Sequence, residues 1–157
     1  MLTEQEFQKA AERYLEMVYR IALNYFRSPQ DAEDAAQETM LRLWRAEVSF
    51  TGEEHLRYWL TRVAVNVCRD MSRSPWRTRT VALEHCPEPS FTDPGQSSLY
   101  EAVRALPAKY RLPLYLFYYY EGYSVTETGE LLGLKVSTVQ TRLARGREKL
   151  KRALEEA

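Results

Sequence analysis

Basic side chains are gathered near the C-terminus, in residues 135–152, where only one acidic residue, Glu148, accompanies them. The basic residues of this segment are Lys135, Arg142, Arg145, Arg147, Lys149, Lys151 and Arg152. Cationic side chains bind the phosphates of DNA, and an α-helix is narrow enough to enter the major groove. The chemistry that this segment could do is therefore recognition of nucleic acid, with a solvated basic helix as the alternative.

Two short helices joined by a turn are predicted to position the basic residues. Candidate capping boxes mark both helix starts, because a Ser precedes a Glu or Gln by three residues in the pairs Ser124/Glu127 and Ser137/Gln140. Gly133 can end the first helix in a left-handed conformation. The second helix would pack Val139, Leu143, Gly146 and Leu150 inward and leave Gln140, Thr141, Ala144 and Arg145 outward. This is a helix-turn-helix, and a merely solvated helix needs no second helix packed across it.

Three amphipathic helices are predicted upstream, ending near residue 27, spanning residues 29 to about 45, and spanning about 53–72. Thr3 and Glu6 form a further candidate capping box, and Pro29 suits a first helical position. The third helix would bury Leu56, Trp59, Leu60, Val63, Ala64, Val67 and Met71. Asn66 has little propensity for a helix interior, which predicts a specific hydrogen bond there. Residues 46–54, with Phe50 and Gly52, read as a loop.

A proline-containing linker is predicted at residues 74–97, between two domains. A short helix should follow from residue 98 and end at Pro107. Residues 110–121 are rich in Leu, Tyr and Phe and should be buried, in a helix that begins near Pro113 or kinks there. The predicted fold is all-α, with two small helical domains at residues 1–73 and 98–157.

Composition limits the function classes. The chain has 157 residues, 45% apolar and 28% charged, with a formal net charge of zero. Residues 31–38 are acidic and the C-terminal segment is basic, which suggests two different partners. Cys68 and Cys86 form neither a disulfide framework nor a zinc spacing, so we expect a reduced, cytoplasmic protein without a metal or other cofactor. No stretch is apolar enough for secretion or membrane insertion.

Three strings, taken in order, resemble the bacterial RNA polymerase sigma factors of the extracytoplasmic-function subgroup. They are DAEDAAQETMLRLWR at residues 31–45, RYWLTRVAVNVCRDMSR at 57–73 and ALPAKYRLPLYLFYYYEGYS at 105–124. The resemblance covers nearly the whole chain. It implies two helical domains, regions two and four, that recognise the minus-10 and minus-35 promoter elements. It also implies a non-enzymatic protein, monomeric when free, whose partners are core polymerase, promoter DNA and an anti-sigma protein.

The resemblance assigns roles by position. Residues that would contact the clamp helices of the largest polymerase subunit are Asp34, Gln37, Glu38, Leu41 and Trp44. Residues that would bind the minus-10 strand are Arg42, Phe50 and Asn66. Residues that would recognise minus-35 are Thr138, Gln140, Thr141, Ala144 and Arg145. Expected phosphate contacts are Lys135, Arg142, Arg147 and Lys149.

The sequence departs from the family pattern at three positions. Thr128 and Gly129 stand where an apolar residue and Ala usually pack, and Gln140 stands where a basic residue is frequent. A glycine inside a helix costs about 1 kcal/mol of helix propensity. We expect these departures to affect the minus-35 preference and the stability of the second domain.

Two other functions compete with this interpretation. A free-standing helix-turn-helix regulator acting as a dimer would leave the linker and the acidic helix unexplained. A carboxylate-bridged metal enzyme would need Glu-x-x-His pairs on facing helices, and neither His55 nor His85 provides one. Nucleophile–base pairs and glycine-rich phosphate loops are not found in the sequence.

Overall fold

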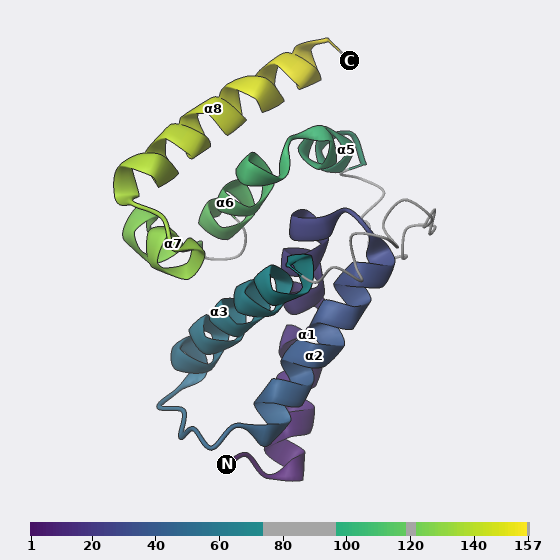
Figure 1. Ribbon diagram of the computed structural model, residues 1–157, viewed down its shortest axis with the longest axis vertical. Helices are drawn as coiled ribbons and strands as arrows, with labels where there is room; N and C mark the ends of the chain where they lie inside the picture. The colour runs from purple at the N-terminus through teal and green to yellow at the C-terminus, as the bar shows by residue number, and fades with distance from the viewer. Residues whose placement is uncertain (74–96, 119–121, 157) are drawn as a thin grey trace. The chain divides into compact units, whose positions relative to one another are not determined.

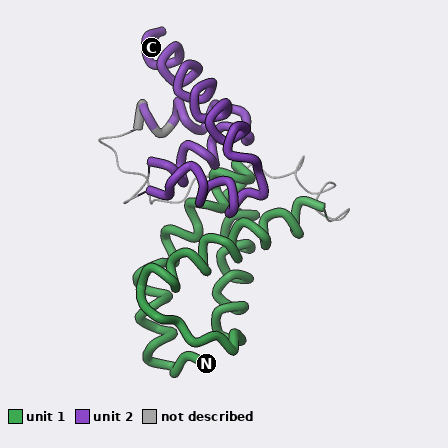
Figure 2. The backbone as a smooth tube through the Cα atoms, turned by 90° about the vertical axis from the view of Figure 1, so that its left-hand side faces the viewer, with its two compact units in different colours: residues 1–86 green, residues 87–157 purple. Residues whose placement is uncertain are grey.

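The computed structural model describes residues 1–73, 97–118 and 122–156, and every regular element in these residues is an α-helix (Figure 1). The chain divides into two compact units, Met1–Cys86 and Pro87–Ala157 (Figure 2). The all-α prediction with two helical domains is confirmed. The predicted linker, residues 74–97, lies outside the described residues except for Ser97, with which the next helix begins.

The first unit contains α1 (Glu4–Phe26), α2 (Pro29–Arg45) and α3 (Glu53–Ser72), which pack on one another. Local hydrogen bonds explain where these helices start. The Thr3 backbone N–H donates to Glu6 Oε1 at 3.0 Å and the Glu6 N–H donates to Thr3 Oγ1 at 3.1 Å, which is the predicted capping box. Ser28 caps α2, and Pro29 occupies its first turn as predicted.

The buried arc of α3 differs from the predicted one. Trp59, Val63 and Met71 are only half-buried, whereas Thr61, Val65 and Cys68 are buried although the apolar spacing did not select them. Both α1 and α2 pack against α3, so its buried surface is wider than a single apolar stripe and is turned toward Thr61, Val65 and Cys68.

The second unit contains α5 (Ser97–Ala105), α6 (Ala108–Tyr118), α7 (Val125–Leu132) and α8 (Val136–Glu155). Its core cluster consists of Leu106, Tyr110, Leu114, Val139 and Leu143. Helix α6 begins five residues before Pro113 and continues through it. Of the two alternatives predicted, a start near Pro113 is therefore wrong, and a kink at Pro113 stays a prediction. Pro113 removes one backbone hydrogen bond, and its burial together with most of α6 offsets that loss.

The helix-turn-helix is formed by α7 and α8. The predicted capping box of α7 is present, with the Ser124 N–H to Glu127 Oε1 and the Glu127 N–H to Ser124 Oγ bonds both 3.0 Å long. Gly133 ends α7 in the left-handed conformation, at φ 68°. The second capping box is not formed, because α8 already begins at Val136 after the extended residue Lys135.

Thr128 and Gly129, the two residues of α7 that depart from the family pattern, are both buried, but their effects on stability are opposite. A Cβ on Gly129 would lie 2.7 Å from the carbonyl oxygen of Leu134, whose own N–H donates to the Gly129 carbonyl at 2.9 Å. The turn therefore approaches α7 too closely for alanine. The Thr128 hydroxyl is buried and has no hydrogen-bond partner among the described residues, which is unfavourable. The expected weakness of this helix thus applies to Thr128, whereas Gly129 is required by the close approach of the turn.

Candidate nucleic-acid interface

Helix α8 presents a polar surface because its opposite side is fixed in the core. Val139, Leu143 and Gly146 are buried, and a Cβ on Gly146 would lie 3.0 Å from Leu114 Cδ1 of α6. The absence of a side chain at Gly146 lets α8 cross α6 closely. Among the five predicted minus-35 residues, Thr138 is half-buried and the others, Gln140, Thr141, Ala144 and Arg145, are exposed.

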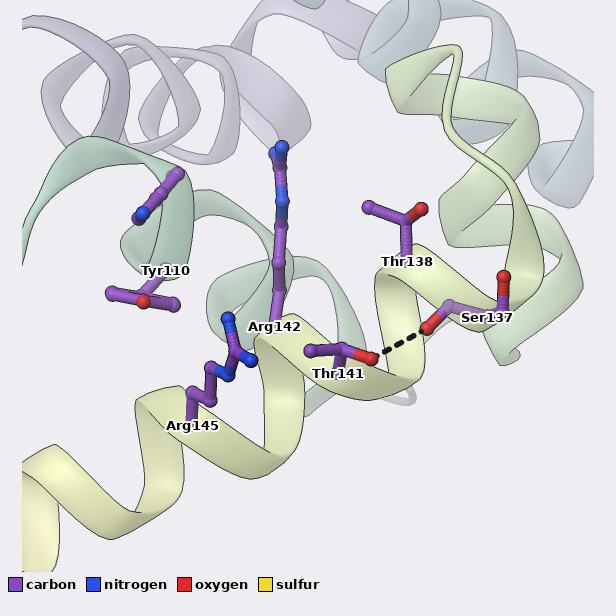
Figure 3. Close-up of a pocket in the computed structure, with 7 residues that line it drawn as sticks. Tyr110, Ser137, Thr138, Thr141, Arg142 and Arg145 are labelled. Carbon is purple, nitrogen blue, oxygen red and sulfur yellow. Dashed lines mark hydrogen bonds between the residues drawn. The ribbon is translucent and has the colours of Figure 1, made fainter.

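An open hollow of about 320 Å³ lies between the start of α6 and the first half of α8. Figure 3 shows Arg142 and Arg145 rising from α8 beside Tyr110 of α6, and the Thr141 hydroxyl donating to the Ser137 carbonyl at 3.0 Å. The hollow is lined by Lys109, Tyr110, Ser137, Thr138, Thr141, Arg142 and Arg145. The described residues of this lining include three cations and three hydroxyl groups besides the Tyr110 ring, and no carboxylate.

The four predicted phosphate residues are distributed around α8. Lys135 is exposed at the start of the helix, and Arg142 is half-buried at the hollow. Arg147 Nη1 donates to the Tyr118 hydroxyl at 2.9 Å, at the end of α6. The Lys149 ammonium lies 5.8 Å from the centre of the Tyr110 ring, near the start of α6. Cations therefore flank α8 on both sides rather than forming one cluster.

A second surface runs along α2 in the first unit. Asp34, Gln37, Leu41 and Trp44 are exposed and Glu38 is half-exposed, and the spacing of three or four residues places these five on one face of the helix. Leu41 and Trp44 are 44% and 40% exposed, which leaves two large apolar side chains beside the carboxylates. Asp31, which belongs to the acidic segment, is buried instead of contributing to this surface.

The three predicted minus-10 residues lie along the α3 side of the first unit without forming one pocket. Arg42 pairs with Glu38 of its own helix at 3.4 Å and with Asp70 of α3 at 3.5 Å. Asn66 lies one helical turn before Asp70, and Phe50 packs edge-on against Trp59 with ring centres 5.4 Å apart. Because Trp59 and Asn66 are seven residues apart, they share a face of α3 at a separation of roughly 10 Å.

Asn66 and Phe50 are both half-buried. The side chain of Asn66 has no hydrogen-bond partner within the described part of the chain, so the specific hydrogen bond expected for it stays a prediction. Its amide is thus available to an external group. The Phe50 ring has a second edge-on neighbour, His55, with ring centres 5.2 Å apart.

Three contacts that shape these surfaces were not predicted from the sequence. Lys109 of α6 lines the hollow beside residues of α8, and Asp70 forms an ion pair with Arg42. The Tyr14 hydroxyl donates to Glu53 at 2.5 Å, which ties α1 to the residue that follows the Phe50 loop. Burial, followed by this carboxylate, raises the pKa of Tyr14 to about 12, so Tyr14 stays a neutral donor at ordinary pH. Each contact joins residues distant in sequence, so no local spacing could have indicated it.

The described helices include none that is long and apolar enough to cross a membrane. Within the described residues, no group of three or more His, Cys, Asp or Glu side chains could hold a metal ion.

Known proteins match both units of the chain. The family described as Sigma-70 region 2 matches residues 10–78, and the family described as Sigma-70, region 4 matches residues 96–150. The ECF RNA polymerase sigma factor SigM of Mycobacterium tuberculosis (strain ATCC 25618 / H37Rv) is 31% identical over 151 residues, which cover 94% of this chain and 76% of SigM. The ECF RNA polymerase sigma factor SigE of Mycolicibacterium smegmatis is 31% identical over 156 residues, and this chain spans 60% of the length of SigE.

Solved structures show the same fold. The sigma factor RpoE of Bartonella quintana, in complex with the anti-sigma factor NepR, has a TM-score of 0.73 at 18% identity, covering 96% of this chain and 98% of RpoE. CnrH, in complex with the cytosolic domain of CnrY, has a TM-score of 0.62 at 22% identity, covering 98% of this chain and 90% of CnrH. With both region matches and the coverage of SigM, the chain belongs to the ECF RNA polymerase sigma factors.

Proposed function

We propose that this protein binds core RNA polymerase and directs promoter-specific initiation, using its second unit for the minus-35 element and its first unit for the minus-10 element. The observation that carries the proposal is the separation of two unlike surfaces on two compact units. One is the acidic and apolar face of α2, and the other is the face of α8, rich in donors and cations.

The surface on α8 supports base recognition in the major groove. Thr141, Ala144 and Arg145 are exposed on the side of α8 away from the core. Arg can make a bidentate contact to guanine, and a small apolar residue can contact the methyl group of thymine, so this face has the chemistry to discriminate bases. Arg147 contacts Tyr118 and Lys149 lies near Tyr110, at the two ends of α6, which supports phosphate contacts by these two residues on either side of α8.

The α2 surface supports binding to a protein rather than to DNA. Its carboxylates would be repelled by phosphates, and exposed apolar side chains such as Leu41 and Trp44 are typical of interfaces with protein partners. Core polymerase is the partner that family membership implies. An anti-sigma protein is a second proposed partner, because RpoE is solved with one. The proposed function needs no catalytic residue and no cofactor, and its place is the cytoplasm.

A paired experiment tests this division of roles. The Asp34→Lys, Glu38→Lys double variant should lose affinity for core polymerase, because cations replace the anionic side chains at the contact, and should still bind duplex DNA. Arg145→Ala should keep its affinity for core polymerase and lose sequence preference by about 1 to 3 kcal/mol at one base pair. Both affinities are measured by fluorescence anisotropy.

The matched control reverses two exposed carboxylates elsewhere, in the Glu155→Lys, Glu156→Lys variant, which has the same net charge as the α2 variant. If the α2 variant and this control bind core polymerase as tightly as the wild type, the assignment of α2 is wrong. A dimeric regulator, the second candidate, would bind duplex DNA as a dimer without polymerase, which analytical ultracentrifugation would detect.

A further inference from the structure

The hollow between α6 and α8 has the chemistry of an anion site. Lys109, Arg142 and Arg145 supply cationic groups, and Ser137, Thr138 and Thr141 supply hydroxyl groups. Arginine and lysine side chains together with hydroxyls are the usual partners of phosphate oxygens in DNA complexes. The Thr141 hydroxyl already donates to the Ser137 carbonyl at 3.0 Å, so this hydroxyl is left with acceptor capacity and the cations must carry most of the binding.

Lys109 is the member of the hollow that does not come from α8. It lies in the first turn of α6 and is exposed, and its ammonium lies 5.1 Å from the centre of the Tyr110 ring. Tyr110 is 5% exposed and belongs to the core cluster, so the ring is a fixed support. A cation at this distance from an aromatic ring is attracted to it, which restricts the long lysine side chain.

The fixed crossing of the two helices places this cation beside α8. Gly146 of α8 packs against Tyr110, where an added Cβ would lie 3.3 Å from Tyr110 Cβ. The Lys149 ammonium, 5.8 Å from the same ring centre, approaches from α8. Lys109 and Lys149 therefore both lie close to the Tyr110 ring, and Arg142 and Arg145 of α8 lie beside the same ring (Figure 3).

A backbone phosphate is the ligand that fits this position. Lys109 reaches the open hollow from α6, to one side of the exposed residues Thr141 and Arg145 of α8, and a helix in the major groove is bordered by the two sugar–phosphate backbones. A free small anion would gain little from an open and hydrated site, whereas a phosphate of a bound duplex is held there by the other contacts of the helix.

We propose that Lys109 anchors a backbone phosphate of the minus-35 duplex in this hollow, as a DNA contact contributed by α6 in addition to those of α8. The inference rests on the proposed function, because α8 must first occupy the major groove. Such a contact carries no sequence information and should affect all sequences alike.

The test compares Lys109→Ala with wild-type full-length protein on two duplexes, one selected for tight binding and one with the same bases scrambled. Lys109→Ala should weaken both by the same factor and reduce the slope of log affinity against log salt concentration by about 0.9, the value for one lost phosphate contact. Lys109→Arg should retain most of the affinity. Lys9→Ala, which removes an exposed lysine of the first unit, is the matched control and should leave the slope unchanged.

A scan with single methylphosphonate linkages, which are uncharged, then locates the contact. At one phosphate the wild type should lose affinity on neutralisation and Lys109→Ala should lose none. The proposal is overturned if Lys109→Ala keeps the wild-type slope, or if every neutralised phosphate weakens both proteins equally. Should Lys109→Ala behave as wild type while Arg145→Ala still relaxes sequence preference, only this inference fails. Absence of duplex binding by every protein would instead count against the proposed function.

Discussion

Two glycines, Gly129 inside α7 and Gly133 at its end, determine how closely the turn of the helix-turn-helix approaches α7. Gly129 and Gly133 do so in different ways, since Gly133 adopts φ 68° and Gly129 is helical but has the Leu134 carbonyl 2.7 Å from the place of a Cβ. A backbone atom at this distance cannot move away as a side chain could. The family preference for alanine at position 129 therefore does not extend to this sequence.

We expect Gly129→Ala to destabilise the second unit. Alanine gains about 1 kcal/mol of helix propensity, but overpacking costs about 1 to 3 kcal/mol, and the rigid backbone contact favours the upper part of that range. The free energy of unfolding should fall by about 1 to 2 kcal/mol. Chemical denaturation followed by circular dichroism, which monitors helices of both units, measures the change.

Tryptophan fluorescence provides an internal control, because the sequence of the second unit, residues 87–157, contains no tryptophan. Its transition should be the same in Gly129→Ala and wild type. Gly52→Ala is the matched variant, since a Cβ there has no atom within 4 Å. Because Gly52 is the N-cap of α3, where glycine is preferred to alanine, any loss of stability should be confined to the first unit and leave the second unit unchanged. Equal or greater stability of Gly129→Ala in both signals would refute this explanation of the glycine.

At the scale of elements, helix boundaries were predictable where a local signal sets them. The boundaries of α2 and α3 agree with the predicted ones, because Ser28 and Pro29 set the start of α2 and Gly52 precedes α3. The start of α8 was missed because Lys135 makes no side-chain cap. The path of α6 through Pro113 depends on burial, which is a tertiary effect that local propensity does not contain.

In the candidate site, too, features set by helical spacing were predictable and contacts between helices were not. The exposed residues of α8 follow from helical spacing once Val139 and Leu143 are assigned to the core. The contribution of Lys109 requires the crossing of α6 and α8, and the pairing of Arg42 with Asp70 requires α2 to lie beside α3. Sequence spacing contains neither fact.

The loop between α2 and α3 is the element that we expect to act in strand opening. Phe50 packs on Trp59 of α3, and the bond from Tyr14 to Glu53 ties the start of α3, directly after the loop, to α1. Stacking of a base on an aromatic ring contributes about 1 to 3 kcal/mol, and the unpaired bases must be held without nucleotide hydrolysis. Phe50→Ala and Asn66→Ala should therefore weaken promoter opening while binding to core polymerase is unchanged.

Permanganate reactivity of minus-10 thymines in the assembled holoenzyme measures this opening. A template already mismatched at minus-10 should restore much of the lost transcription, because the unpairing energy is no longer needed. Asn24→Ala is the control for Asn66→Ala, since the Asn24 amide already donates to the Arg20 carbonyl at 2.9 Å within α1. Lack of rescue by the mismatched template, with polymerase binding intact, would rule out a role in capturing bases.

At the scale of the whole molecule, the formal net charge is zero because acidic and basic residues balance, yet the two units carry surfaces of different charge. The α2 face combines carboxylates with exposed Leu41 and Trp44, and the α8 face combines cations with hydroxyls. Complementary charge speeds association and selects partners more than it adds affinity, so this division suits the proposed binding of polymerase by one unit and DNA by the other.

Run-off transcription by purified core polymerase on a library of promoters tests this account most directly. Addition of the protein should direct transcription to a subset of templates that share two short sequence blocks upstream of the start. Arg145→Ala should change the preference at the block farther from the start and leave the nearer one intact. The account is contradicted if core polymerase transcribes the same templates with and without the protein.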